Sequence, residues 1–201
     1  MQSEGNYFDK YKDNGKIINS IMNGFFKNLE CLLNGITYDT VYEAGCGEGH
    51  ISHHVYNYNR QIQRTVKITA SDLSENIIRQ AKVDFPHILF KVESIYSLNE
   101  EEDSYDLVIA SEVLEHLDQP ENALKEIFRI SNRYVLISVP NEPIWCIANM
   151  VRGKYIRSMG NTPGHIKHWS RRGIVDLISN FGYISKVSTP FPWTMILSEK
   201  K

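Results

Sequence analysis

The segment VYEAGCGEGH, residues 41–50, decides the fold because it places Gly45, Gly47 and Gly49 directly behind a short strand-like run. Glycine tolerates positive φ and has no side chain, so this backbone can lie close to a ligand. A dinucleotide fingerprint needs G-x-G-x-x-G, but His50 stands where the third glycine belongs. A Walker loop needs Lys followed by Ser or Thr after its last glycine, and EGHIS offers neither pair. The spacing therefore excludes ATP or GTP binding by that route.

Short β-branched runs alternate with amphipathic segments on the C-terminal side of this loop. The runs are TVYEA (40–44), VKITAS (66–71), ILFKV (88–92), YDLVIAS (105–111) and YVLISVP (134–140). Such alternation predicts βαβ units around a buried, mostly parallel sheet. Two further runs, 183–188 and 193–197, are joined by TPFP, a link short enough for a hairpin. We therefore predict an α/β fold with a seven-stranded, mostly parallel sheet, helices on both faces and an antiparallel last strand.

The predicted helices carry start and stop signals of their own. Apolar residues at three- and four-residue steps predict an N-terminal helix over about 14–34. The signals are Asn14, Gly35, Ser74, the capping box of Asp118 with Glu121, Ser170 and Gly182. We expect the helices that begin at Ser74 and at the capping box to be crossover helices.

Length and composition favour one cytoplasmic domain. The chain has 201 residues, of which 42% are hydrophobic, and its net charge of −2 supplies no field that would attract a nucleic-acid backbone. Its first residues are polar, and no apolar run approaches the roughly 20 residues that a membrane span needs, so we expect no stable membrane insertion. Three widely separated cysteines without a CxxC pair are typical of reduced thiols.

Glu43 and the three glycines form the pattern acid-x-G-x-G-x-G. A carboxylate only accepts hydrogen bonds, so Glu43 suits a ligand with an ammonium group better than one with phosphates. Here the sequence resembles the class I S-adenosylmethionine-dependent methyltransferases of small-molecule type, over about residues 38–197. SDLSENII, YDLVIASEVLEHL and YVLISVPNE are similar to the family's segments at the second, fourth and fifth strands. The resemblance implies a Rossmann-like fold, a small-molecule acceptor, and the cofactor S-adenosyl-L-methionine with S-adenosyl-L-homocysteine as its product.

The resemblance also implies a set of cofactor-binding residues. They are Glu43, Gly45, Cys46, Gly47, Asp72, Leu73, Ser94, Ile95, Ser111 and Glu112. Glu43 and the glycine loop would hold the methionine part, and Asp72 would accept hydrogen bonds from the ribose hydroxyls. The third segment departs from the family's pattern, because Glu93 and Ser94 stand where a Gly-Asp pair is common near the adenine. Ser94 and the backbone of Ile95 can still serve there.

The stretch from 143 to 175 contains no Asp or Glu, although it carries several Arg, Lys and His residues. One interpretation is a solvated face. The other is a lid-like insertion over about 143–169 that covers the acceptor side of the pocket and selects an anionic acceptor. The candidate substrate-binding residues are Trp145, Arg152, Tyr155 and Arg157. An amphipathic lid against an apolar substrate or a membrane surface is an alternative that the sequence leaves open.

The reaction that the resemblance implies is in-line methyl transfer. The cofactor's positive charge already activates the methyl group, so the protein mainly aligns the acceptor and excludes water. A general base is needed only for an acceptor that arrives protonated, and the candidates are His165 and His168 in NTPGHIKHWS. The His50–His54 run has no acid or cysteine cluster beside it, so we predict no metal site.

Two other functions stay open at this point: a non-catalytic S-adenosylmethionine-binding regulator or scaffold, and a nucleotide-dependent dehydrogenase. The sequence leaves the acceptor, the methylated atom and the oligomeric state undetermined.

Overall fold

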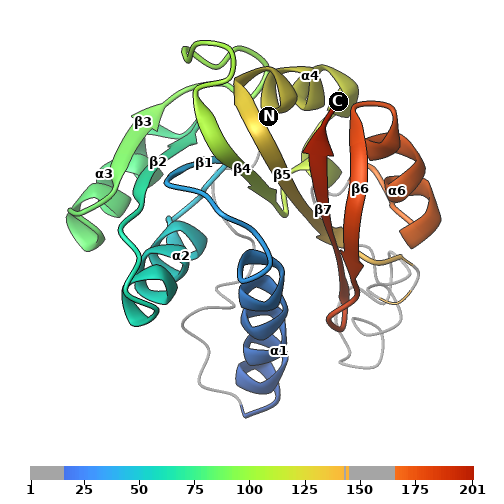
Figure 1. Cartoon of the computed structure of the whole chain (residues 1–201), viewed down its shortest axis with the longest axis horizontal. Helices are drawn as coiled ribbons and strands as arrows, with labels where there is room; N and C mark the ends of the chain where they lie inside the picture. The colour runs from blue at the N-terminus through green and yellow to red at the C-terminus, as the bar shows by residue number, and fades with distance from the viewer. Residues whose placement is uncertain (1–15, 143, 145–165) are drawn as a thin grey trace.

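The computed structural model describes residues 16–142, 144 and 166–201. Its strands form a seven-stranded sheet in the order β3-β2-β1-β4-β5-β7-β6 (Figure 1). The strands are β1 (Thr40–Ala44), β2 (Lys67–Asp72), β3 (Leu89–Val92), β4 (Tyr105–Ser111), β5 (Ser131–Pro140), β6 (Gly182–Ser188) and β7 (Trp193–Lys200). β1 to β5 pair in parallel, whereas β7 runs antiparallel to both β5 and β6. The predicted fold class and the antiparallel last strand are confirmed.

Helices cover both faces of the sheet (Figure 1). They are α1 (Lys16–Leu33), α2 (His50–Gln61), α3 (Glu75–Asp84), the short 3-10 helix η1 (Leu114–His116), α4 (Pro120–Ile130) and α6 (Arg171–Ser179). Apolar residues of α1, α2 and α3 pack in one core cluster, and those of α4 and α6 in the other. α1 lies within the range expected to be helical.

β4 shows why the central strands have continuous apolar sequences. Leu107 and Ile109 belong to the core under α1, α2 and α3, whereas Val108 and Ala110 belong to the core under α4 and α6. Because side chains alternate between the faces of a strand, a strand buried on both faces is apolar at successive positions and not only at every second one.

Two of the predicted helix caps are present. The Ser74 hydroxyl accepts a hydrogen bond from the Ile77 amide at 3.5 Å, and the Ser170 hydroxyl accepts one from the Gly173 amide at 3.1 Å. Both cap residues have extended backbones, which is typical of the position before a helix.

The capping box at Asp118 was a wrong prediction. α4 begins at Pro120, and the residue before it, Gln119, makes no side-chain capping bond. Proline at the first helical position lacks an amide hydrogen and already has a helical φ, so this end needs less help from a cap. The Asp118 carboxylate instead accepts a hydrogen bond from the Tyr96 hydroxyl at 3.3 Å.

The last helix ends earlier than its predicted glycine stop. α6 ends at Ser179, and Gly182 begins β6. A Cβ at Gly182 would lie 2.7 Å from the Glu199 carbonyl oxygen and from the Phe128 ring, so close packing requires this glycine. Among the described residues, no helix is both long enough and apolar enough to cross a membrane.

Candidate cofactor and acceptor site

The glycine loop between β1 and α2 is attached to the end of β2. The amides of Gly45 and Cys46 both donate to the Ser71 carbonyl, each at 2.8 Å, and the Gly47 amide donates to Asp72 Oδ2 at 2.9 Å. Because the carboxyl ends of parallel strands share one edge of the sheet, this loop lies where such sheets bind ligands.

The three glycines of the loop have positive φ angles but different surroundings. Their φ values are +74° for Gly45, +52° for Gly47 and +81° for Gly49. A Cβ at Gly45 would meet Val113 Cγ2 at 2.6 Å, and one at Gly49 would meet Phe90 Cζ at 2.7 Å. A Cβ at Gly47 would meet nothing within 4 Å. Packing therefore requires glycine at two positions, whereas Gly47 leaves an open space that a ligand can approach.

Asp72 connects the glycine loop to the start of α3. Its Oδ2 accepts from the Gly47 amide at 2.9 Å, and its Oδ1 accepts from the Ser74 amide at 3.0 Å. A carboxylate oxygen has more than one acceptor site, so both oxygens retain capacity for ligand hydroxyls. The next side chain, Leu73, is apolar yet 56% exposed at the same edge. This combination fits a ligand with hydroxyl groups and a flat apolar part.

Glu43 lies beneath the loop and points toward α2. Only 1% of the residue is exposed, and its Oε2 accepts hydrogen bonds from the Ser52 amide, at 2.9 Å, and from the Ser52 hydroxyl. Burial raises the pKa of Glu43 to about 7, although the Ser52 bonds oppose the shift and the charge of Asp72 adds to it. Glu43 therefore positions the first turn of α2 in addition to its predicted ligand contact.

Cys46 is a buried residue of the same loop. Burial, followed by the charges of Glu43 and Asp72, raises the pKa of the Cys46 thiol well above its ordinary value. A neutral thiol is a poor nucleophile, so a structural role in the loop suits Cys46 better than a covalent one.

Ser94 and Ile95, the predicted adenine contacts, form a tight turn after β3. The Ser94 hydroxyl accepts from the Tyr96 amide at 3.3 Å, and the Ser94 carbonyl accepts from the Ser97 amide at 2.9 Å. Glu93 anchors this turn, since its carboxylate accepts from the Tyr42 hydroxyl at 2.9 Å and its amide donates to the Asp72 carbonyl at 3.1 Å. The structure therefore brings the turn beside the end of β2.

Ser111 and Glu112 join the end of β4 to β5. The hydroxyls of Ser111 and Ser138 are 2.6 Å apart, and the Glu112 amide donates to the Ser138 carbonyl at 3.0 Å. Glu112 has a φ of +60°, which a residue with a side chain adopts rarely and at some cost. Such strained positions are frequent at ligand sites.

The acceptor side is described only in part. Trp145, Arg152, Tyr155, Arg157 and His165 lie outside the described residues, as does most of the predicted insertion. The described part is the strap, residues 166–170.

The strap crosses from η1 to the end of β5. The amides of Ile166 and Lys167 donate to the Glu115 carbonyl at 2.9 and 3.1 Å, and the Glu142 amide donates to the Trp169 carbonyl at 3.0 Å. His168 lies between these attachments, with its Nδ1 3.5 Å from Glu142 Oε1. The strap thus places an imidazole and a carboxylate together beside the ends of β4 and β5.

Residues 13–184 match a family model described as a methyltransferase domain. The chain belongs to this methyltransferase family. The match confirms the resemblance to class I S-adenosylmethionine-dependent methyltransferases, and with it the class of enzyme and the cofactor. The dehydrogenase alternative is wrong, in agreement with the missing third glycine at position 50.

Solved structures share the fold of this methyltransferase at low sequence identity. The PH0226 protein from Pyrococcus horikoshii OT3 has a TM-score of 0.73 and 15% identity, with 97% of each chain covered. Magnesium protoporphyrin IX methyltransferase from Synechocystis PCC 6803, with bound SAH, has a TM-score of 0.69 and 16% identity, covering 96% of this chain and 91% of that one. A SAM-dependent methyltransferase from Methanosarcina mazei has a TM-score of 0.65 and 19% identity, covering 85% and 96%. No curated protein sequence matches the chain.

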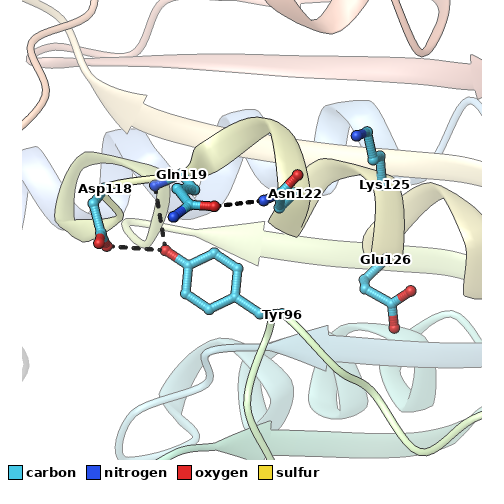
Figure 2. A pocket seen from close by; sticks show the side chains of 6 residues that line it. All are labelled: Tyr96, Asp118, Gln119, Asn122, Lys125 and Glu126. Atoms are coloured by element: carbon cyan, nitrogen blue, oxygen red, sulfur yellow. Dashed lines mark hydrogen bonds between the residues drawn. The ribbon is translucent and has the colours of Figure 1, made fainter.

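A pocket of about 370 Å³ lies beside the start of α4 (Figure 2). Its lining residues are Tyr96, Asp118, Gln119, Asn122, Lys125 and Glu126. Several of them hydrogen-bond to one another, for example Asn122 Nδ2 to Gln119 Oε1 at 2.6 Å. None belongs to the glycine loop, and only Tyr96 belongs to the turn after β3, so most of this pocket lies outside the proposed cofactor site. The described residues also contain no group of three or more side chains suited to hold a metal ion.

The sequence did not indicate the residues that hydrogen-bond to the predicted site residues and hold them in place. Ser52, Ser71 and Tyr42 hold Glu43, the glycine loop and Glu93. Their pattern in the sequence gives no signal, because a serine or tyrosine in a strand or helix is ordinary. Only the pairing of strands shows what each one contacts.

Proposed function

We propose that this methyltransferase transfers the methyl group of S-adenosylmethionine to a small, anionic acceptor above the carboxyl ends of β4 and β5. The observation that supports cofactor binding most directly is Gly47. Its backbone has a positive φ, its missing Cβ faces open space, and its amide is already oriented by Asp72. A glycine that packing does not require is expected where a ligand lies against the backbone.

Each part of the proposed cofactor site has a separate role. Asp72 would accept the ribose hydroxyls, and Leu73 would contact the adenine with its exposed side chain. Ser94 and Ile95 would border the adenine. Ser111 and Glu112 would border the methionine part of the cofactor. Glu43, Gly45 and Cys46 would form the floor beneath that part. When bound, the cofactor supplies a methyl group that its sulfonium charge has activated. The chain's own residues bind the cofactor, orient the acceptor and exclude water.

The proposal for the acceptor depends on charge. Residues 143–175 include Arg152, Arg157 and Arg171 and no acid, so they favour an anion over a cation or a neutral molecule. Arginine binds a carboxylate or a phosphate with two parallel hydrogen bonds, which would align the acceptor with the methyl group. Trp145 and Tyr155 would supply apolar contact, and His165 or His168 would accept a proton. We also propose that the chain forms a single domain.

Calorimetry and a methyl-transfer assay together test this function. S-Adenosylmethionine and S-adenosylhomocysteine should bind one site per chain, and NADH should not bind. Radioactivity from [methyl-³H]S-adenosylmethionine should enter a deproteinised small-molecule extract only when the protein is present. Binding without transfer to any component would support the non-catalytic regulator and overturn the enzymatic proposal.

A further inference from the structure

The strap of residues 166–170 holds His168 between two backbone attachments. Backbone hydrogen bonds hold the strap on both sides of His168, to the Glu115 carbonyl before it and to the Glu142 amide after it. Lys167 is exposed, whereas Trp169 is half-buried against the core under α4 and α6. His168 therefore lies on a segment whose backbone is attached to η1 on one side and to the residue two positions after β5 on the other.

Glu142 follows the end of β5 and is also held in place. Its amide bonds to Trp169 of the strap, and the preceding Asn141 amide donates to the Pro192 carbonyl at 2.9 Å. Its side chain is only 11% exposed, while that of His168 is 45% exposed. The pair thus has a shielded carboxylate on the inside and an accessible imidazole on the outside.

The position of the pair fits the acceptor side of the site. β5 pairs with β4, and β4 pairs with β1, so the end of β5 lies two strands from the glycine loop. Two strand spacings correspond to about 10 Å. The pair therefore lies on the β5 side of the glycine loop, at the edge of the sheet where the acceptor is proposed to bind.

We infer that His168 acts as a general base, that Glu142 positions its imidazole, and that the acceptor is methylated on a hydroxyl oxygen. Glu142 Oε1 lies 3.5 Å from His168 Nδ1, so the carboxylate would favour the tautomer with the proton on Nδ1 and leave Nε2 able to accept a proton. This inference depends on the proposed function, because a base has no role here without methyl transfer.

The step balances in atoms and charge. The hydroxyl oxygen forms a bond to the methyl carbon, the carbon–sulfur bond breaks with its electron pair retained by sulfur, and the hydroxyl proton passes to His168 Nε2. The resulting imidazolium lies beside the Glu142 carboxylate, which stabilises its charge. An acceptor carboxylate would arrive already ionised and would need no base, so a histidine paired with an acid favours a hydroxyl.

Other charged residues lie on the strap or on the elements next to it in the fold. They are Lys167 on the strap, Arg171 at the start of α6, and Glu115 in η1. Of these charged groups and Glu142, only Glu142 is recorded at ion-pair distance from His168 among the described residues. Removal of Glu142 should therefore impair the base more than removal of either cation.

The first experiment needs no acceptor. Two-bond ¹H–¹⁵N spectra of the protein bound to S-adenosylhomocysteine, at a pH where the ring is neutral, report which nitrogen of His168 carries the proton. We expect Nδ1–H in the parent protein and in Glu142→Gln, whose amide oxygen still accepts, and a shift to Nε2–H in Glu142→Ala. The same tautomer in all three proteins would overturn the positioning role.

The second experiment measures initial rates of ³H-methyl incorporation into the small-molecule extract. His168→Gln should lower the rate roughly 100-fold and flatten the acid limb of its pH profile, and Glu142→Ala should lower it roughly tenfold. Affinity for S-adenosylhomocysteine should stay within about twofold, because neither side chain holds the cofactor. His87→Gln, an exposed histidine on the loop before β3, is the matched control and should behave like the parent.

Two outcomes separate this inference from the proposed function. No incorporation by the parent protein would overturn the proposed function and the inference with it. Incorporation that His168→Gln leaves unchanged would overturn the inference alone, as would a labelled product that releases volatile methanol in base, since that product is a methyl ester.

Discussion

The two sides of the site are built differently. On the cofactor side, the amides of Gly45, Cys46 and Gly47 bond to Ser71 and Asp72, which belong to a strand of the sheet. On the acceptor side, a strap lies across the strand ends and is attached by backbone bonds to Glu115 and Glu142. The cofactor side is therefore part of the sheet's own geometry. The proposed acceptor side is an addition to it, so we expect changes there to leave cofactor binding nearly unchanged.

The largest effect is expected inside the glycine loop, where Gly49 and Gly47 should fail in different ways. Gly49→Ala places a Cβ 2.7 Å from Phe90 Cζ at a φ of +81°. Clash and backbone strain together should lower the free energy of unfolding by roughly 2 to 4 kcal/mol. Gly47→Ala meets no neighbour, so it should cost about 1 to 2 kcal/mol of strain and mainly reduce cofactor affinity.

Urea unfolding and calorimetry with S-adenosylhomocysteine separate the two losses. Gly49→Ala should lose more stability than Gly47→Ala. The affinity of Gly47→Ala for S-adenosylhomocysteine should fall by more than its loss of stability explains. If both variants lost stability and affinity in equal proportion, the open space at Gly47 would have no connection with the ligand.

The sequence patterns that predict the cofactor side are local. The glycine spacing, the acid at the end of β1 and the acid at the end of β2 all follow strands whose apolar runs are recognisable. Even the rejection of dinucleotide and Walker loops depended on one or two positions near Gly49. The mostly parallel sheet and the antiparallel β7 were predictable from the alternation of runs and from the short TPFP link, whereas the order of the strands was not predicted.

Contacts between distant segments could not be predicted in the same way. Nothing in the sequence pairs Glu142 with His168, since they come from different segments that meet only in the fold. The capping box at Asp118 failed because a tertiary partner, Tyr96, takes its carboxylate. Glu43 was expected at the ligand, and the structure adds Ser52 as a partner that no pattern indicates.

The next effect concerns the buried acid of the cofactor side. The folded-state pKa of Glu43 is raised to about 7, so the folded protein binds this proton more tightly than the unfolded chain does. Stability from this group is present below the ordinary pKa of a glutamate, about 4.3, and is lost as pH rises through 7. The loss should reach about 3 kcal/mol.

Glu43→Gln removes that dependence while it keeps the shape of the side chain. Urea unfolding at pH 5 and pH 8 should show the parent losing more stability than the variant over this interval. Ser52→Ala, which removes the hydroxyl that bonds to Glu43, is a useful second variant, because it should leave the sign of the pH dependence unchanged. Parallel curves for the parent and Glu43→Gln would show that this carboxylate is not the group that titrates.

A smaller effect is expected at the ribose contact. Asp72→Ala should weaken S-adenosylmethionine binding by roughly 1 to 3 kcal/mol, because ligand hydroxyls would lose their acceptor in a partly dry site. The variant also frees the amides of Gly47 and Ser74, so Ser74→Ala serves as a control for the loss of order at the start of α3. Calorimetry on folded protein decides the matter, and parent-like affinity in Asp72→Ala would refute the ribose assignment.

The smallest effect tests whether positive charge on the proposed acceptor side attracts the acceptor without affecting the cofactor. Arg171 is exposed at the first position of α6, and Arg171→Glu reverses its charge. An exposed ion pair is worth up to about 1 kcal/mol, so the apparent KM for the acceptor pool should rise roughly two- to fivefold. A glutamate at a helix N-terminus slightly stabilises the helix, so reduced folding would not explain the change.

Arg172→Glu is the matched control, since Arg172 carries the same charge one residue further on, 93% exposed and 3.8 Å from Asp176. It should change the acceptor KM less than Arg171→Glu does. Reversal of Arg152 or Arg157 should act like reversal of Arg171, with S-adenosylhomocysteine affinity nearly constant. Added salt should weaken the acceptor more than the cofactor, because exposed charges are screened over about 8 to 10 Å at physiological ionic strength. Acceptor kinetics that respond neither to salt nor to any of these reversals would eliminate the anionic acceptor and favour an apolar one held by Trp145 and Tyr155.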